Sequence, residues 1–284
     1  MGIDAAGQVE ELGLRHGGSR GAFEVDGHPH SITAGPLPTE FPPGRSHGLG
    51  VATPGIPVHT GRMGPLTGAP RPFTDREYAG RELATHFTAY RDRSDVVVLG
   101  LARGGVPIAA AVARSIGAPF DALIVRKLGV PGHEEVAFGA LAAHGPQQAE
   151  VRMDRIIASL PPEKRRPEAL NVVRDRESAE LVRRQQSYLR GRGINVADRT
   201  VILCDDGLAT GASMRAAVQV MRAYHPDRVI VAAPVGPPEV CSELATVADE
   251  VVCPRQPEQF GAVGAFYAGY DQLTDEDVLR ILGG

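Results

Sequence analysis

Short apolar runs alternate with helical stretches from residue 96 onward. Each run is rich in Val and Ile and lacks a polar alternation, which is typical of strands buried on both faces. The runs are 96–101, 122–125, 201–204, 229–233 and 251–253. Helical patterns lie between them at 107–116, 212–224 and 238–247. This order predicts an α/β fold with a mostly parallel sheet and helices on both faces.

The chain changes character at Thr74. The run from Thr74 to Glu77 has the pattern of a capping box, and the apolar spacing after it predicts a helix over 75–90. Residues 1–72, by contrast, are rich in Gly and Pro and show neither helical nor strand periodicity. Such a composition buries too little apolar surface to offset the entropy of ordering the chain. We therefore expect 1–72 to be disordered and the folded domain to span 73–284.

Composition argues against several classes of partner. The formal net charge is -4 and no helix-turn-helix or basic arm is evident, which argues against a nucleic-acid partner. The apolar runs are far shorter than the roughly 20 residues that cross a bilayer, and no signal pattern follows Met1, so we expect no membrane association. Cys204, Cys241 and Cys253 lack the spacing of a disulfide framework or a zinc site, which indicates a reducing, cytoplasmic location.

The segment most specific for function is 201–213, where four apolar residues end in Asp205 and Asp206. The C-terminal ends of parallel strands face the crevice that binds ligands, so both carboxylates are expected at this edge. Adjacent buried carboxylates repel each other, and hydrated Mg²⁺ or sugar hydroxyls would relieve that repulsion. The turn that follows can surround a phosphate with backbone N–H groups at the start of the next helix. It consists of Gly207, Leu208, Ala209, Thr210, Gly211, Ala212 and Ser213.

This run resembles the motif with which type I phosphoribosyltransferases bind 5-phosphoribosyl 1-pyrophosphate (PRPP). In that family, apolar residues precede Asp-Asp, three further residues and Thr-Gly-x-Thr/Ser, and 201–213 matches throughout. The resemblance implies the type I phosphoribosyltransferase fold, with a C-terminal hood over the acceptor, here expected at 254–270. It also implies that Asp205 and Asp206 bind the ribose hydroxyls, directly or through Mg²⁺ and its water, and that 207–213 holds the 5-phosphate.

The loop after the first apolar run agrees with the resemblance. The family places a short loop with Gly-Gly and a basic residue there to bind pyrophosphate, and this chain has Arg103, Gly104 and Gly105. That loop often contains a cis peptide bond without proline in the family. We therefore expect one between Ala102 and Arg103.

A basic pair follows the second apolar run. Arg126 and Lys127 suit the several negative charges of a pyrophosphate. The adenine-type members of the family carry a mobile loop after such a pair, and 130–135 takes that place here. These residues either close over the reaction centre or are ordinary exposed loop residues.

Two segments leave alternatives open. Residues 152–192 form a charged insertion with a helical pattern at 168–189, which is either a solvated lid or cap or a direct contact to phosphate or nucleic acid. In the expected hood, Phe260, Phe266 and Tyr267 either stack on the acceptor or pack in the core.

Taken as a family member, the chain is expected to be a Mg²⁺-dependent transferase of nucleotide salvage. It would move the 5-phosphoribosyl group from PRPP to a nucleobase-like nitrogenous acceptor and release pyrophosphate. The resemblance makes Asp205, Asp206, Arg103 and Lys127 catalytic, with Arg126 binding substrate, and implies a homodimer. A regulator that senses PRPP without turnover, or a hydrolase of a phosphorylated ribose, would use the same phosphate-binding site. Both alternatives therefore stay open. The acceptor itself does not follow from the sequence.

Overall fold

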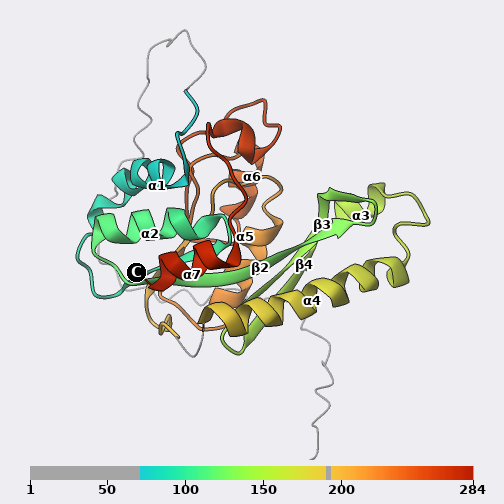
Figure 1. The fold of residues 1–284 in the computed structure, drawn as a ribbon, viewed down its shortest axis with the longest axis horizontal. Coiled ribbons are helices and arrows are strands. Elements are labelled where there is room, and N and C mark those ends of the chain that lie inside the picture. Colours follow the sequence, from blue (N-terminus) through green and yellow to red (C-terminus); the bar gives the residue numbers. More distant parts are fainter. Residues whose placement is uncertain (1–70, 190–192, 284) are drawn as a thin grey trace, which may run out of the picture. The chain divides into compact units, whose positions relative to one another are not determined.

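The computed structural model describes residues 71–189 and 193–283 (Figure 1). Its sheet has the strand order β4-β3-β2-β1-β5-β6-β7. The strands are β1 (Val96–Ala102), β2 (Phe120–Val130), β3 (His133–His144), β4 (Gln147–Arg152), β5 (Thr200–Cys204), β6 (Arg228–Ala232) and β7 (Glu250–Val252). Strands β2, β1, β5, β6 and β7 run parallel, and β3 and β4 add an antiparallel edge. The predicted α/β fold with a mostly parallel sheet is confirmed.

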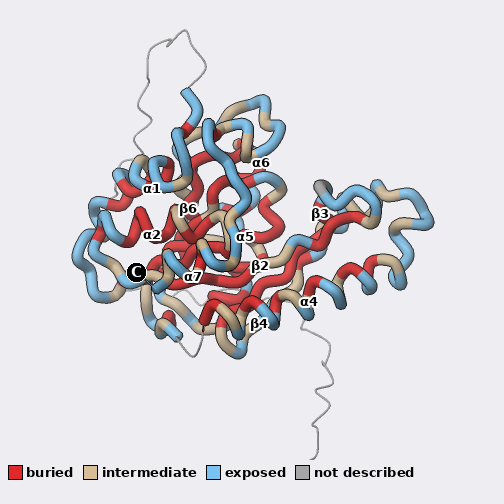
Figure 2. Tube along the Cα trace, viewed as in Figure 1, coloured by how far each residue is buried: buried red, intermediate tan, exposed pale blue. Residues whose placement is uncertain are grey.

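Helices cover both faces of this sheet (Figure 1). They are α1 (Arg76–Ala84), α2 (Gly105–Ile116), α3 (Asp154–Ser159), α4 (Pro167–Leu189), α5 (Ala212–Arg222), α6 (Pro238–Leu244) and α7 (Asp275–Gly283), with 3₁₀ turns η1 (Thr85–Tyr90) and η2 (Val263–Phe266). Val97 and Leu99 of β1 pack with α5 and α6, whereas Val96 and Val98 pack with α1 and α2. Since successive strand residues point to opposite faces, a strand covered on both sides must be apolar throughout. Figure 2 shows the central part of the sheet as buried, and every residue of β1 and β5 is buried.

The parallel register brings three loops to one edge of the sheet. Gly100 of β1 lies beside Cys204 of β5, and Cys204 lies beside Ala232 of β6. The loops that leave β1, β5 and β6 therefore emerge next to one another. This is the edge where α/β sheets bind ligands.

The antiparallel edge was not predicted. Strand β2 continues to Val130, and residues 131 and 132 turn directly into β3, so the segment 130–135 belongs to a β-hairpin rather than to a free loop. Strand β3 is rich in Ala and Gly, residue types with low strand propensity, which conceals it in the sequence. From Ala137 to Ala143 it is buried on both faces, so it also lacks the polar alternation of a half-exposed strand.

Helix α4 packs along β2 and β3 instead of standing free in solvent (Figure 2). Leu170, Val173 and Leu181 are buried on its inner face, together with the charged residues Glu177 and Arg184. The charged insertion therefore covers the hairpin. The many charged residues of α4 obscure its apolar inner face in the sequence. That face carries enough apolar residues to hold the helix against the hairpin.

The start of the folded part differs by one residue from the prediction. Asp75, not Thr74, caps helix α1, because its carboxylate accepts the Tyr78 N–H at 2.7 Å. The predicted disorder of 1–72 falls almost entirely on residues 1–70, which lie outside the described residues, so that disorder and the boundary at residue 73 stay predictions. Within 71–189 and 193–283, no helix is long and apolar enough to span a bilayer.

Candidate active site

A small cavity lies where β5 passes into α5. Its lining consists of Lys127, Asp205 and residues 207–214. Gly211 caps α5 with a φ of +73°, a conformation that favours glycine, and a Cβ there would lie 3.0 Å from Val240 Cγ1. The first N–H groups of α5 have no carbonyl one turn back, and the helix dipole places partial positive charge at them. This cavity, which we call the cradle, is suited to an anion.

Ser213 points an unsatisfied hydroxyl into this region. The residue is 7% exposed, and its Oγ has no hydrogen-bond partner among the described residues. Leaving a buried hydroxyl unpaired costs about 1–3 kcal/mol. Thr210 Oγ1, one turn earlier, accepts the Ala212 N–H at a long 3.5 Å. Both hydroxyls are therefore available to the oxygens of a bound phosphate.

Asp205 is a carboxylate that lacks a strong partner. It is half-buried, and the one hydrogen bond that its carboxylate accepts within the described part of the chain comes from the backbone N–H of Asp206 at 2.9 Å. Burial raises the pKa of Asp205 well above its usual value, the charge of Asp206 adds to this, and Lys127 counteracts part of the rise. A carboxyl group in this state gains from any cation that reaches it.

Asp206, in contrast, is held by protein groups through one carboxylate oxygen and its backbone carbonyl. Its Oδ2 accepts hydrogen bonds from Arg76 Nε at 2.8 Å and from the Tyr270 hydroxyl at 3.0 Å. The Tyr267 hydroxyl donates to its backbone carbonyl at 2.6 Å. Burial opposes the charge of Arg76, but Asp206 outweighs that effect and raises the pKa of the guanidinium. Asp206 thus ties β5 to α1 and to the C-terminal segment.

Arg76 and Tyr270 were missed by sequence reasoning. The Arg76 guanidinium lies 4.0 Å from the centre of the Tyr270 ring and also donates to the Asp271 carbonyl at 2.9 Å. Neither residue belongs to a recognisable motif, and Arg76 is separated from Asp206 by 130 positions. The only signal was the strength of the helix start at residues 74–77.

The Gly-Gly loop lies directly against the acid pair. A Cβ on Gly104 would lie 2.2 Å from Asp206 Oδ2, and a Cβ on Gly105 would lie 2.3 Å from the Cys204 carbonyl oxygen. No side chain fits at either position. The predicted cis peptide bond between Ala102 and Arg103 is present. The loop and the two acids therefore form one continuous surface.

The two residues of the basic pair point to opposite faces of the sheet. Lys127 lines the cradle. Arg126 faces α4, where its Nε donates to Glu177 Oε2 at 2.7 Å. Neighbouring strand residues alternate between faces, which accounts for this separation. The structure brings Lys127 to the cradle and does not bring Arg126 there.

The aromatic residues of the predicted hood contact one another. Phe260 and Phe266 stack with their ring centres 5.1 Å apart. Tyr267 is 6% exposed and packs against Phe73, so its ring belongs to the core. Cys204 is also fully buried, as expected for a core residue.

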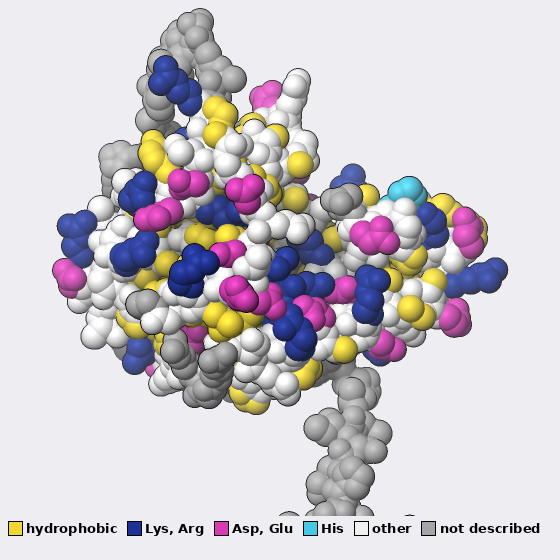
Figure 3. Space-filling view, viewed as in Figure 1, with side chains coloured by type: hydrophobic (Ala, Val, Ile, Leu, Met, Phe, Trp, Pro, Cys, Tyr) yellow, Lys and Arg dark blue, Asp and Glu magenta, His cyan; other side chains and the backbone are white. Residues whose placement is uncertain are grey.

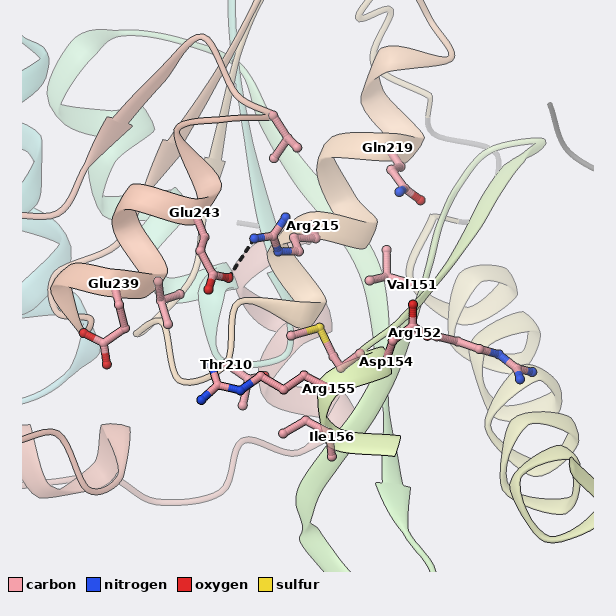
Figure 4. Close-up of a pocket in the computed structure, with 13 residues that line it drawn as sticks. Val151, Arg152, Asp154, Arg155, Ile156, Thr210, Arg215, Gln219, Glu239 and Glu243 are labelled. Carbon is pink, nitrogen blue, oxygen red and sulfur yellow. Dashed lines mark hydrogen bonds and ion pairs between the residues drawn. The ribbon is translucent and has the colours of Figure 1, made fainter. Parts of the chain in front are cut away.

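A larger cleft of about 500 Å³ adjoins the cradle at Thr210 (Figure 4). Residues from the end of β4 and from α3 form one wall, and residues of α5 and α6 form the other. Arg215 pairs with Glu243 at 2.8 Å in the second wall, while Arg155 extends from α3 toward the side of Thr210. Both the cleft and the cradle carry both signs of charge, but only the cradle also contains the start of α5 and the unsatisfied Ser213 hydroxyl.

A family model described as the phosphoribosyl transferase domain matches residues 76–266. This chain belongs to the phosphoribosyl transferase family. A relative from Mycobacterium tuberculosis strain H37Rv, named "Putative phosphoribosyl transferase Rv0571c", is 42% identical over 211 residues, which is 74% of this chain and 46% of that protein. The chain thus spans about half the length of this curated relative. The crystal structure of TT1426 from Thermus thermophilus has a TM-score of 0.59 and 40% identity, covering 74% of this chain and 97% of that one.

The residues of this member of the phosphoribosyl transferase family fit a Mg²⁺ ion that is held jointly with a ligand. Among the described residues, no group of three or more His, Cys, Asp or Glu side chains could hold a metal ion alone. Mg²⁺ commonly binds through one or two carboxylates plus substrate phosphates and water. Asp205 supplies such a carboxylate, whereas the Oδ2 atom of Asp206 is already taken by Arg76 and Tyr270.

Proposed function

We propose that this chain transfers the 5-phosphoribosyl group of PRPP to a nucleobase-like nitrogenous acceptor and releases pyrophosphate. The observation that carries the proposal is the unsatisfied, buried Ser213 hydroxyl in a cradle that also contains Asp205 and Lys127. A sugar phosphate would pair with the hydroxyl and the helix start, and its ribose would lie near the carboxylate. Membership of the family supports the reaction class.

In this reaction the chain stabilises charge that appears as the bond at C1 of the ribose breaks. The leaving pyrophosphate gains negative charge, which Lys127, Arg103 and the backbone N–H groups at Gly104 and Gly105 are placed to stabilise. Asp205 faces the positive charge that develops on the sugar. Mg²⁺, bound by Asp205 and the substrate oxygens, would neutralise part of the pyrophosphate charge. The acceptor nitrogen then forms the new bond to C1.

The roles of the two acids are divided in this proposal. Asp205 contacts the ribose hydroxyls or the ion, and Asp206 holds the loop and the hood in place through Arg76, Tyr267 and Tyr270. The unpaired state of Cys204, Cys241 and Cys253 supports the proposed cytoplasmic location. A homodimer and a role in nucleotide salvage complete the proposal.

Pyrophosphate release tests the reaction directly. The purified chain is incubated with PRPP and Mg²⁺, alone and with each of a panel of purines, pyrimidines and other amines. We expect release only with a matching acceptor, together with an N-ribosylated product. Release without any acceptor would identify a hydrolase instead, and PRPP binding without release would identify a sensor.

Replacing Ser213 by Ala should weaken PRPP binding about tenfold, because one hydrogen bond to a charged phosphate is lost. The melting temperature should stay level or rise slightly, since the unpaired hydroxyl disappears from a buried site. Isothermal titration with PRPP and Mg²⁺ measures the affinity. Ser115→Ala serves as the matched control, because the Ser115 hydroxyl already donates to the Ala111 carbonyl within α2. Equal affinity in wild type and Ser213→Ala would place the phosphate elsewhere.

A further inference from the structure

The C-terminal helix α7 begins beside the Gly-Gly loop, and its start is well fixed. Thr274 Oγ1 accepts the Asp277 N–H at 3.1 Å, and Asp277 Oδ2 accepts the Thr274 N–H at 2.8 Å, which forms a capping box. Val278, one residue later, is fully buried against the inner face of α4 and the sheet. Asp275 therefore has a defined position at the first turn of the helix.

Helix α4 holds the carboxylate of Asp275. The Tyr188 hydroxyl donates to Oδ1 at 2.5 Å, and Arg183 Nη2 donates to Oδ2 at 2.6 Å. Partial burial opposes ionisation, but the hydrogen bonds from Tyr188 and Arg183 outweigh it and keep the pKa of Asp275 below its usual value. Asp275 is therefore an ionised group at neutral pH. In Figure 3, basic and acidic side chains gather together over this part of the surface.

Asp275 faces the loop residue Arg103. The Arg103 Nη1 atom lies 3.7 Å from Asp275 Oδ1, close enough for charge attraction but too far for a hydrogen bond. Among the described residues, no hydrogen bond uses the Arg103 side chain, so its five N–H donors remain available to a ligand. The side chains of Arg103 and Asp275 are each 30% exposed, which leaves a ligand access to the guanidinium.

We propose that Asp275 is a positioning residue that aims Arg103 at the pyrophosphate group of PRPP. An arginine side chain has many rotamers, and a fixed carboxylate beside it favours those that keep the guanidinium next to the loop. Arg183 also pairs with Glu180, so it offsets only part of the charge of Asp275, and nearby Arg184 adds to that offset. Together the two arginines limit the repulsion between Asp275 and an incoming polyanion. The insertion helix α4 and the terminal helix α7 thereby become parts of the pyrophosphate subsite. The inference rests on the proposed function.

Affinity for pyrophosphate-bearing ligands tests this role. Isothermal titration is done with PRPP and, separately, with inorganic pyrophosphate, each with Mg²⁺. Asp275→Asn should weaken both about tenfold, and Tyr188→Phe should weaken both about threefold, since it removes one of the two bonds that fix Asp275. In activity assays with the acceptor that the pyrophosphate-release panel identifies, these variants should raise the KM for PRPP and leave kcat unchanged. Asp275→Glu should restore part of the affinity.

The affinity losses of single and double variants distinguish a positioning role of Asp275 from a structural one. Arg103→Ala should weaken binding at least as much as Asp275→Asn, and the double variant should lose no more than Arg103→Ala alone, because Asp275 acts through Arg103. Arg280→Gln is the matched control, since it removes an exposed ion pair with Asp277 on the same helix and should leave affinity unchanged. Melting temperatures of all variants are recorded with the titrations.

Three results would overturn the inference. Unchanged or tighter binding by Asp275→Asn and Tyr188→Phe at normal melting temperature would show that Asp275 does not position Arg103. Additive losses in the double variant would show that the two residues act separately. A wild-type protein that binds neither PRPP nor pyrophosphate would overturn the proposed function and this inference together, an outcome visible before any variant is compared.

Discussion

Replacing Asp205 by Asn should make the unliganded protein more stable while removing its PRPP-dependent activity. Activity should fall roughly a hundredfold or more, because a charge that acts on the reacting sugar and its ion is lost. Burial and Asp206 raise the pKa of Asp205, so its ionised form is disfavoured in the folded state. A gain of about 1 kcal/mol would raise the melting temperature of a domain of this size by roughly 2–4 °C.

The pH dependence of this gain has a definite sign. A carboxyl with a raised folded-state pKa costs stability progressively as pH rises from its unfolded value, near 4, through its folded value. The advantage of Asp205→Asn should therefore be largest at neutral and alkaline pH and should vanish below about pH 4. Thermal melts at pH 4 and pH 8 measure it. An equal difference at both values would show that Asp205 is not the source.

Asp206→Asn provides the matched comparison and should shift stability in the opposite direction. The half-buried Arg76 would lose its charged partner, at a cost of about 1–3 kcal/mol. Two adjacent acids that look equivalent in the sequence should thus have opposite effects on the melting temperature. The double variant should have no activity and a stability no higher than that of wild type, because part of the gain at Asp205 depends on the charge of Asp206. An active, Mg²⁺-dependent double variant would contradict the proposed chemistry.

Replacing Gly105 by Ala should destabilise the protein by about 3 kcal/mol, or roughly 6–12 °C in melting temperature, because the new methyl meets backbone that cannot move aside. Its Cβ would lie 2.3 Å from the Cys204 carbonyl oxygen and 3.0 Å from Asp205 Cα. Both atoms belong to the end of the central strand β5 or to the residue after it. Activity should be lost as well, since the loop would move away from the acids.

Gly104→Ala and Gly261→Ala provide comparisons for the stability loss of Gly105→Ala. Gly104→Ala should cost less stability, since its Cβ would meet the Asp206 carboxylate, which is the end of a side chain. It should still impair activity by displacing that carboxylate from Arg76. Gly261→Ala should be neutral, because a Cβ there has no neighbour within 4 Å among the described residues. Thermal melts of the three variants rank the sites, and a neutral Gly105→Ala would show that the loop is not packed on β5.

The parallel strands of the sheet and the segment that forms the cradle could be predicted from sequence because their signals are local. Buried parallel strands are short apolar runs, and the segment 201–213 combines a strand end, two acids and a helix start without interruption. The position of Arg126, by contrast, depends on how far its strand continues. The sequence marks it as a cation beside Lys127, but only the continuation of β2 to Val130 makes the alternation of faces apply to the pair.

The partners of the site residues could not be predicted because they come from distant parts of the chain. Asp206 binds Arg76 and Tyr270, and Arg103 faces Asp275, through contacts that only the folded chain creates. The start of helix α7 is visible in the sequence, because Thr274 and Asp277 have the spacing of a capping box. That spacing predicts a helix start but not the loop beside which it lies.

A crystal structure with ribose 5-phosphate and Mg²⁺ tests the central claim most directly. The phosphate oxygens should lie within hydrogen-bonding distance of the N–H groups at the start of α5 and of the Ser213 hydroxyl, with the ribose next to Asp205. A phosphate found in the larger cleft beside Arg155, or a cradle that stays empty at saturating ligand, would contradict the account.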